Sequence, residues 1–163
     1  MTAVILACSA SKQRHPARAL DLYTGPLFAS ARRWALSVVP ASRIWVLSAR
    51  HGLVNGSELI APYDYRARDA DELVQLMARV GPHLAQLRAG PVFAVGGSVY
   101  RQAIERVLPE AITLSSLLPA GRATRGIGAQ RGWLRRHEGQ LPDDSLLSPE
   151  LVVAPPPREG SRA

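Results

Sequence analysis

Polar side chains that could bind an anion or move a proton follow three short apolar runs of this sequence. They are Cys8, Ser9 and Lys12 after the first run, Ser48, Arg50, His51 and Gly52 after the second, and Gly96, Gly97 and Ser98 after the third. Hydroxyl groups, a thiol, an ammonium group and the backbone N–H groups of a helix start suit an anion or the edge of a nucleobase. An imidazole transfers protons near neutral pH, so His51 is the first candidate for acid or base catalysis.

Two further polar and aromatic patches lie between the apolar runs. "DLYTGPLF" contains Asp21 and Tyr23, and "APYDY" contains Pro62, Tyr63 and Asp64. We expect the two tyrosine rings to hold a nucleobase between them, and either aspartate to act as a general base or to stabilise a cation. The competing interpretation is that the tyrosines fill the core and the aspartates cap helices.

Other assignments follow from residue type. Lys12, Arg50 and Arg101 are expected to hold phosphate groups, whereas Cys8 is either a nucleophile or a small buried hydrophobic residue. The glycine spacing of a P-loop and the G-x-G-x-x-G fingerprint are both absent, and the four histidines and the single cysteine lack metal-ligand spacing. We therefore expect neither a cofactor nor a metal.

The elements that position these residues follow from the apolar pattern. Four strands are expected at Thr2–Cys8, Ile44–Ser48, Pro91–Val95 and Ala111–Leu114. Helices are expected from Pro26 to just before Pro40, over Asp69–Leu87 with a kink or split at Gly81–Pro82, from Ser98, and over Ile127–His137. The remaining segments Ser9–Leu22 and Ala49–Arg68 are expected to be loops.

Alternating strands and helices indicate an α/β fold. We expect three layers, with a mostly parallel four-stranded sheet covered by helices on both faces, and a site at the carboxyl ends of the strands. Residues 1–138 are expected to form a single domain. Residues 139–163 are expected to form a flexible, proline-rich tail with a short hydrophobic docking segment at Leu151–Val153.

Charge and composition indicate which classes of ligand and which cellular location to expect. Residues 1–57 carry seven Lys or Arg against one acid, and residues 114–138 carry five against one, although nineteen of the twenty basic residues are arginine, as a GC-rich genome would also produce. These segments indicate DNA or a nucleotide as the ligand. One cysteine rules out an internal disulfide, and no apolar stretch reaches the ~20 residues of a membrane span, so a soluble cytoplasmic protein is expected.

The motifs "DLYTGPLF", "VLSARHGLV", "IAPYDYRAR" and "GIGAQRGWL" occur in the order found in a family of short bacterial and phage proteins of unassigned function, and the resemblance covers about residues 3–135. More distantly, "YTG", "LS-x-x-x-GL" and "PY" are similar to the peroxide-stress protein YaaA family, which is described as DNA-binding. Both families resemble uracil-DNA glycosylase-like domains in layout, but the GQDPYH-type and HPSP motifs of that superfamily are absent here.

Three functions are consistent with these observations. The first is a DNA- or nucleotide-directed protein of genome maintenance or stress defence, with a DNA glycosylase-like activity in which His51 contacts or protonates the base and Asp64 stabilises the sugar cation or activates water. The second is a DNA-binding stress protein without catalysis. The third is a nucleoside or nucleotide hydrolase or transferase.

Overall fold

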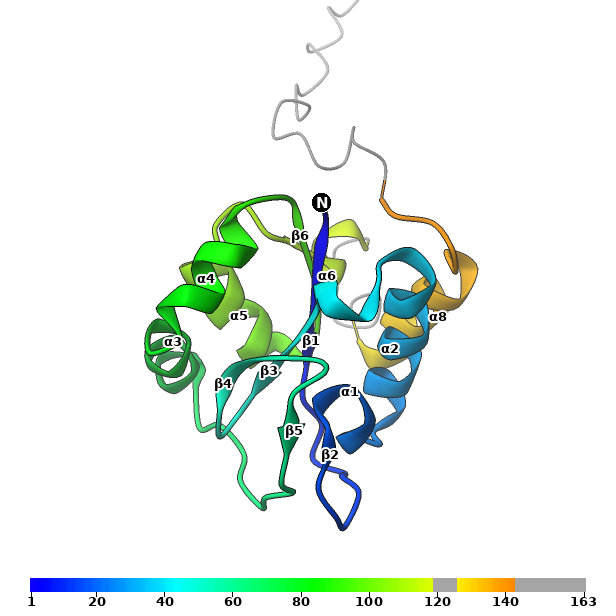
Figure 1. Cartoon of the computed structure of the whole chain (residues 1–163). Helices are drawn as coiled ribbons and strands as arrows, with labels where there is room; N and C mark the ends of the chain where they lie inside the picture. The colour runs from blue at the N-terminus through cyan, green and yellow to red at the C-terminus, as the bar shows by residue number, and fades with distance from the viewer. Residues whose placement is uncertain (119–125, 143–163) are drawn as a thin grey trace, which may run out of the picture.

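The computed structural model describes residues 1–118 and 126–142, and at its centre lies a five-stranded sheet in the order β4-β3-β1-β6-β7 (Figure 1). Its strands are β1 (Ala3–Ala7), β3 (Ile44–Ser48), β4 (Gly52–Asn55), β6 (Val92–Val95) and β7 (Ile112–Thr113). Only β4 pairs antiparallel with its neighbour, while the other strands pair in parallel. The expected mostly parallel α/β sheet is confirmed, with one strand more than the four expected.

Helices cover both faces of the sheet because both faces of its central strand are apolar. Val4 and Leu6 of β1 pack into one core, whereas Ala3 and Ile5 pack into the other, as the alternation of side chains along a strand requires. All residues of β1 are buried. Such a strand reads as a continuous apolar run, which is why the sequence predicted it well.

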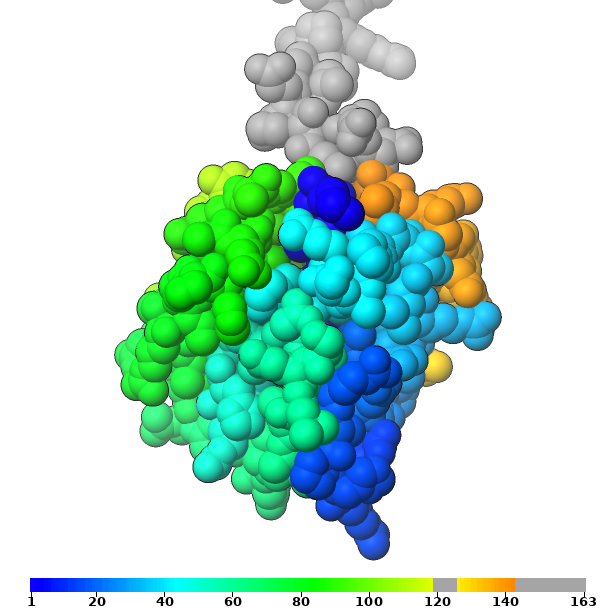
Figure 2. Space-filling view, in the orientation of Figure 1, coloured from blue at the N-terminus to red at the C-terminus, as the bar shows by residue number. Residues whose placement is uncertain are grey.

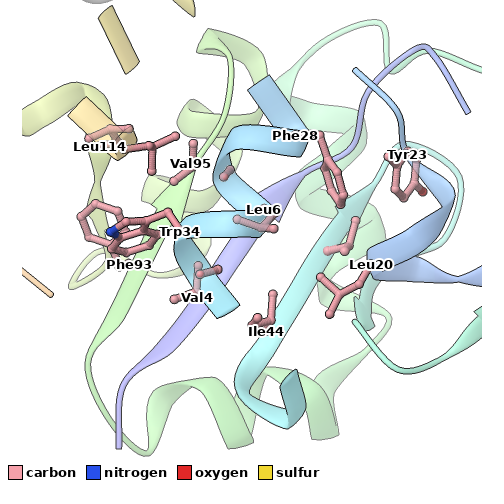
Figure 3. Close-up of a cluster of buried hydrophobic side chains, with 14 of the residues drawn as sticks. Val4, Leu6, Leu20, Tyr23, Phe28, Trp34, Ile44, Phe93, Val95 and Leu114 are labelled. Carbon is pink, nitrogen blue, oxygen red and sulfur yellow. The ribbon is translucent and has the colours of Figure 1, made fainter. Parts of the chain in front are cut away.

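The described helices are α1 (Ala19–Leu22), α2 (Pro26–Val38), α3 (Ala70–Ala78), α4 (Gly81–Arg88), α5 (Ser98–Val107), α6 (Leu114–Leu117) and α8 (Ile127–Arg136), with a 3₁₀ turn, η1, at Ala41–Arg43. Figure 1 shows α2 and α8 on one side of the sheet and α3, α4 and α5 on the other. In the core under α2 and α8, Trp34 packs against Phe93 with ring centroids 5.0 Å apart (Figure 3).

The helix expected over Asp69–Leu87 is split into α3 and α4. Asp69 caps α3 by accepting a hydrogen bond from the Glu72 N–H at 3.0 Å. The chain then leaves helical geometry at Val80, and Pro82 lies in the first turn of α4, where its missing N–H costs nothing. The expected break at Gly81–Pro82 is therefore confirmed as a split.

The expectation that Ser9–Leu22 and Ala49–Arg68 are loops was wrong in part. Within them lie α1, β4 and two short strands, β2 (Ala17–Arg18) and β5 (Leu59–Ile60), which pair antiparallel. Figure 2 shows these two chain segments side by side, and Figure 1 shows β2 and β5 beyond the carboxyl ends of β1 and β3. Two-residue strands have no detectable periodicity, so their pairing depends on contacts remote in sequence.

The segment after β3 folds back as a hairpin. Ser48 pairs with Gly52 across a turn made by Ala49, Arg50 and His51. Gly52 has φ +71°, and a Cβ there would lie 2.9 Å from the Leu76 carbonyl oxygen, so both conformation and space require glycine. The motif "SARHG" therefore forms a tight turn between antiparallel strands.

Two further expectations concerned a membrane span and the C-terminal tail. None of the helices within residues 1–118 and 126–142 is long and apolar enough to cross a membrane. Of the expected tail, only residues 139–142 are described, so the expected docking segment Leu151–Val153 lies outside the described residues.

Candidate functional site

A cavity of about 520 Å³ lies at the carboxyl ends of β1 and β6. These neighbouring strands are followed by helices on opposite faces of the sheet, since α2 covers one face and α5 the other (Figure 1). Ligands of open α/β sheets bind at such a switch point, where two connections leave in opposite directions. The cavity therefore lies where this sheet topology places a binding site.

Seven of the residues expected at the site line this cavity. They are Cys8, Ser9, Lys12, Asp64, Gly96, Gly97 and Ser98. The strand-end rule thus assembles two of its three expected segments, those after β1 and β6. Asp64 reaches the same cavity from the loop after β5.

Three helices begin at the cavity wall. The N-caps of α2, α5 and α8 are Gly25, Gly97 and Gly126, and none of them provides a side chain that bonds to the first turn. Residues of each first turn line the cavity, among them Leu27 and Ile127. The positive ends of three helix dipoles and their backbone N–H groups therefore lie around one space, which favours an anion there.

Lys12, the single lysine of the chain, adds a positive charge to the cavity. Its Nζ lies 4.3 Å from the centroid of the Tyr63 ring and 5.7 Å from that of Tyr23, and it donates a hydrogen bond to the Ala10 carbonyl oxygen at 3.1 Å. The two tyrosine rings hold the ammonium group by cation–π attraction. This places the charge between the cavity and the aromatic pair.

A partly buried network of hydroxyl groups supports these rings. The Tyr63 hydroxyl lies 2.8 Å from both the Tyr23 hydroxyl and Ser48 Oγ. Ser48 Oγ already accepts the N–H groups of Arg50 at 3.2 Å and His51 at 3.1 Å, so its own hydrogen is directed to Tyr63. Burial raises the pKa of both Tyr23 and Tyr63, so these hydroxyl groups stay protonated to higher pH than those of ordinary tyrosines.

The expectation that Tyr23 and Tyr63 hold a nucleobase between them was wrong. Their ring centroids are 6.4 Å apart with the planes at 72°, and their hydroxyl groups are hydrogen-bonded to each other. Tyr23 is 3% exposed. Stacking on both sides of a base requires two roughly parallel rings with open space between them, and here the rings meet edge to face.

His51 does not line the cavity, contrary to the expectation that it contacts a bound base. It lies on the β3–β4 turn, with its ring edge-on to that of Tyr63 at a centroid distance of 5.6 Å. Burial, and then the positive charge of Arg50, lower the pKa of His51. The physical reason for the wrong placement is the hairpin, which turns the chain back along β3 instead of across the sheet edge.

Several other expected site residues also lie away from the cavity lining. They are Asp21, Tyr23, Ser48, Arg50, Gly52, Pro62, Tyr63 and Arg101. Asp21 pairs with Arg18 at 2.8 Å and Arg32 at 2.7 Å; burial acts to raise its pKa, but these two partners outweigh burial and lower it. Arg101 pairs with Glu105 at 3.1 Å, so its charge is engaged within α5.

Sequence reasoning missed other residues of the lining, above all Tyr100. Its hydroxyl accepts a hydrogen bond from Cys8 Sγ at 3.3 Å, and burial raises its pKa. Phe28, Tyr65 and Arg66 also line the cavity. The available signal was position, because Tyr100 lies in the first turn of the helix that follows "GGS", and Tyr65 and Arg66 directly follow Asp64.

The described part of the chain contains no group of three or more His, Cys, Asp or Glu side chains arranged to hold a metal ion. The polar groups at the cavity are instead a thiol, hydroxyls, one carboxylate, cationic side chains and backbone N–H groups. This set can bind an anionic group and position a carboxylate beside it.

Comparison with known proteins assigns a family. The chain belongs to a family described as "Family of unknown function (DUF6884)", whose model matches residues 3–136. No curated protein and no solved structure gives a significant match. The matched range contains the whole five-stranded sheet and the cavity, and the similarity to the YaaA family remains a prediction from sequence motifs.

Proposed function

We propose that this member of the family binds a nucleotide, either free or as one unit of DNA, in the cavity at the ends of β1 and β6. The observation that supports the proposal best is the meeting of three uncapped helix starts and the Lys12 ammonium group around one space. Backbone N–H groups at helix starts and a lysine are the groups that proteins use to hold phosphate.

The rest of the cavity suits the nucleoside part of such a ligand. Leu27, Phe28 and Val99 provide apolar wall, and Ser9, Ser98 and Asp64 provide polar groups. A volume of about 520 Å³ falls within the range of small-molecule sites. A cytoplasmic role in genome maintenance or stress defence is consistent with this ligand class.

Cys8 provides a direct test because it is the single cysteine and lines the cavity. We expect nucleoside mono- or diphosphates to slow its alkylation by iodoacetamide, because a bound ligand covers the thiol. Nucleosides without phosphate should protect less at equal concentration. No protection by any nucleotide up to millimolar concentration would refute the proposal.

Lys12→Gln tests the phosphate contact by calorimetry. Loss of one charge-assisted hydrogen bond, worth about 1.5 kcal/mol, should weaken nucleotide binding roughly tenfold. Arg14→Gln is the matched control, because it removes an exposed positive charge two residues away that does not line the cavity. Equal losses in both variants would mean that general charge, not the site, determines binding.

Cleavage of an N-glycosidic bond is a second candidate function, favoured by the Asp64 carboxylate in the cavity lining. Asp64 would take a proton from a water whose oxygen bonds to the sugar C1′, while the bond to the base nitrogen breaks and its electron pair stays on the base. The base nitrogen then takes up a proton from solvent, and Asp64 returns the proton of the attacking water to solvent. Chromatography of nucleosides, nucleotides and single-stranded DNA would detect the free base.

The expected result for this second function is distinctive. Asp64→Asn should abolish base release while nucleotide affinity stays within about threefold, because a neutral amide keeps the shape of the side chain. His51→Gln should retain turnover, since His51 lies outside the cavity lining. If no substrate releases a base, the protein binds nucleotides without this chemistry.

A further inference from the structure

A second hollow, of about 230 Å³, lies between α2 and α8. Its lining is Ser30, Arg33, Trp34, Arg131, Leu134, Arg135 and Glu138. This α2–α8 groove combines the two basic segments of the sequence, because α2 belongs to the first and α8 to the second, and the two helices pack against each other (Figure 1). Three arginines face one acid in it.

The arginines of the groove have guanidinium N–H groups that can still bind a ligand. Arg33 pairs through Nε with Glu138 at 3.1 Å, and Arg131 donates through Nε to Ser30 Oγ at 3.1 Å. Both contacts leave the terminal guanidinium nitrogens of these arginines without a partner among the described residues. Arg135 is exposed and has no described partner either. Guanidinium groups of this kind bind phosphate oxygens in pairs.

The groove adjoins the cavity. α2 and α8 run in the same direction, because Arg131 contacts Ser30 near their starts, whereas Gly139, just past the end of α8, donates its N–H to Ser37 near the end of α2. Both helices start at the cavity, and Ser30 of the groove lining is followed directly by Ala31 of the cavity lining. A chain with one unit in the cavity can therefore continue into the groove.

We infer that the α2–α8 groove binds the phosphate backbone of a single-stranded nucleic acid, of which one nucleotide occupies the cavity. The inference rests on the proposed function and names its ligand as a strand. A single strand fits because its units can separate from one another, so that one enters the cavity while the adjacent phosphates contact arginines outside it.

The test compares two double variants with equal charge change. Arg131→Gln with Arg135→Gln removes groove charges. Arg79→Gln with Arg88→Gln removes exposed charges just after α3 and on α4, on the other side of the sheet. All four side chains are exposed, so both variants should fold, which circular dichroism checks. Fluorescence anisotropy with a labelled single-stranded oligodeoxynucleotide measures binding.

We expect the groove variant to lose affinity for the oligonucleotide about tenfold at low salt and to reduce the slope of log affinity against log salt by about 1.4, the value for two phosphate contacts. The control should change either quantity far less. Mononucleotide affinity should be unchanged in both variants. An unchanged slope in the groove variant, or an equal loss in the control, would overturn the inference.

Further measurements distinguish a single strand from other ligands, and failure of the groove inference from failure of the proposed function. Equal affinity and slope for duplex DNA would overturn the assignment to a single strand, and the same arginine dependence with anionic phospholipid vesicles would overturn nucleic acid as the partner. If wild-type protein binds the oligonucleotide through the groove but neither mononucleotides nor the oligonucleotide protect Cys8 of the cavity from alkylation, the proposed function fails alone. If mononucleotides bind and the groove variant behaves like the control, the groove inference fails alone.

Discussion

Replacing Tyr63 by phenylalanine tests whether the partly buried network of hydroxyl groups holds the edge of the sheet together. The Tyr63 hydroxyl joins Tyr23 and Ser48 with two hydrogen bonds of 2.8 Å each. Ser48 is fully buried, and its oxygen is already engaged by two backbone N–H groups. The substitution therefore removes the acceptor of the Ser48 hydrogen.

The expected magnitude follows from these contacts. Two buried hydrogen bonds contribute about 1 kcal/mol each, and a buried hydroxyl without a partner adds further cost, so the free energy of unfolding should fall by about 2 to 3 kcal/mol. For a chain of this size, that corresponds to a decrease in Tm of about 5 to 10 °C. Nucleotide affinity should remain within about twofold, because phenylalanine keeps the ring face under Lys12.

Urea denaturation and calorimetry would measure the change. Tyr65→Phe is the matched control: it removes a hydroxyl bonded to Glu72 from a side chain that is 40% exposed, and should cost less than about 0.5 kcal/mol. If the two variants lose equal stability, the network does not stabilise the fold as argued. A large loss of nucleotide affinity in folded Tyr63→Phe would refute the view that its hydroxyl acts only in support.

Gly96→Ala should destabilise the protein by about 1 to 3 kcal/mol in urea titrations, because the new Cβ would lie 2.5 Å from the Ala7 Cβ. Gly97→Ala is the control and should leave stability unchanged, because no atom lies within 4 Å of its new Cβ. A larger loss in Gly97→Ala than in Gly96→Ala would contradict this packing argument. Stability should fall as pH rises above about 10, because the unfolded chain then releases protons that Tyr23, Tyr63 and Tyr100 keep when folded, since burial raises the pKa of each. A flat profile would show that their pKa values are not raised. By NMR, His51 should titrate below the ordinary histidine pKa, and Arg50→Gln should raise that pKa; no change would exclude the charge of Arg50 as a cause.

The sequence predicts the centre of the fold better than its edge. β1, β3 and β6 are buried on both faces, and β1 and β3 read as apolar runs that begin and end within a residue or two of the strands found. β2 and β5 have two residues each and stabilise one another only through a pairing between segments some forty residues apart. No local sequence pattern indicates such a pairing, so β2 and β5, which lie beyond the carboxyl edge of the sheet (Figure 1), were predicted as loop.

The difference between regular strands and irregular connections also explains which of the expected site residues line the cavity. The rule that ligands bind at the carboxyl ends of parallel strands predicted that the segments after β1 and β6 would lie together, and these two segments line the cavity. It did not hold for His51, because the rule assumes that a crossover follows the strand, and β3 is followed by the antiparallel strand β4. The sequence feature that indicates such a turn is the glycine after His51, and Gly52 has a positive φ in the structure.

The hairpin explains why so many polar residues gather at this edge although fewer than half of those predicted line the cavity. In this tight turn Ser48 Oγ accepts the N–H groups of Arg50 and His51, which directs its own hydrogen to Tyr63. Tyr63 in turn lies under Lys12, the side chain that reaches the cavity. The polar groups at this edge therefore form a chain of contacts: the turn N–H groups bond to Ser48, Ser48 bonds to Tyr63, and the Tyr63 ring contacts the Lys12 ammonium group. Residue type alone does not distinguish the residues that support Lys12 from those that line the cavity.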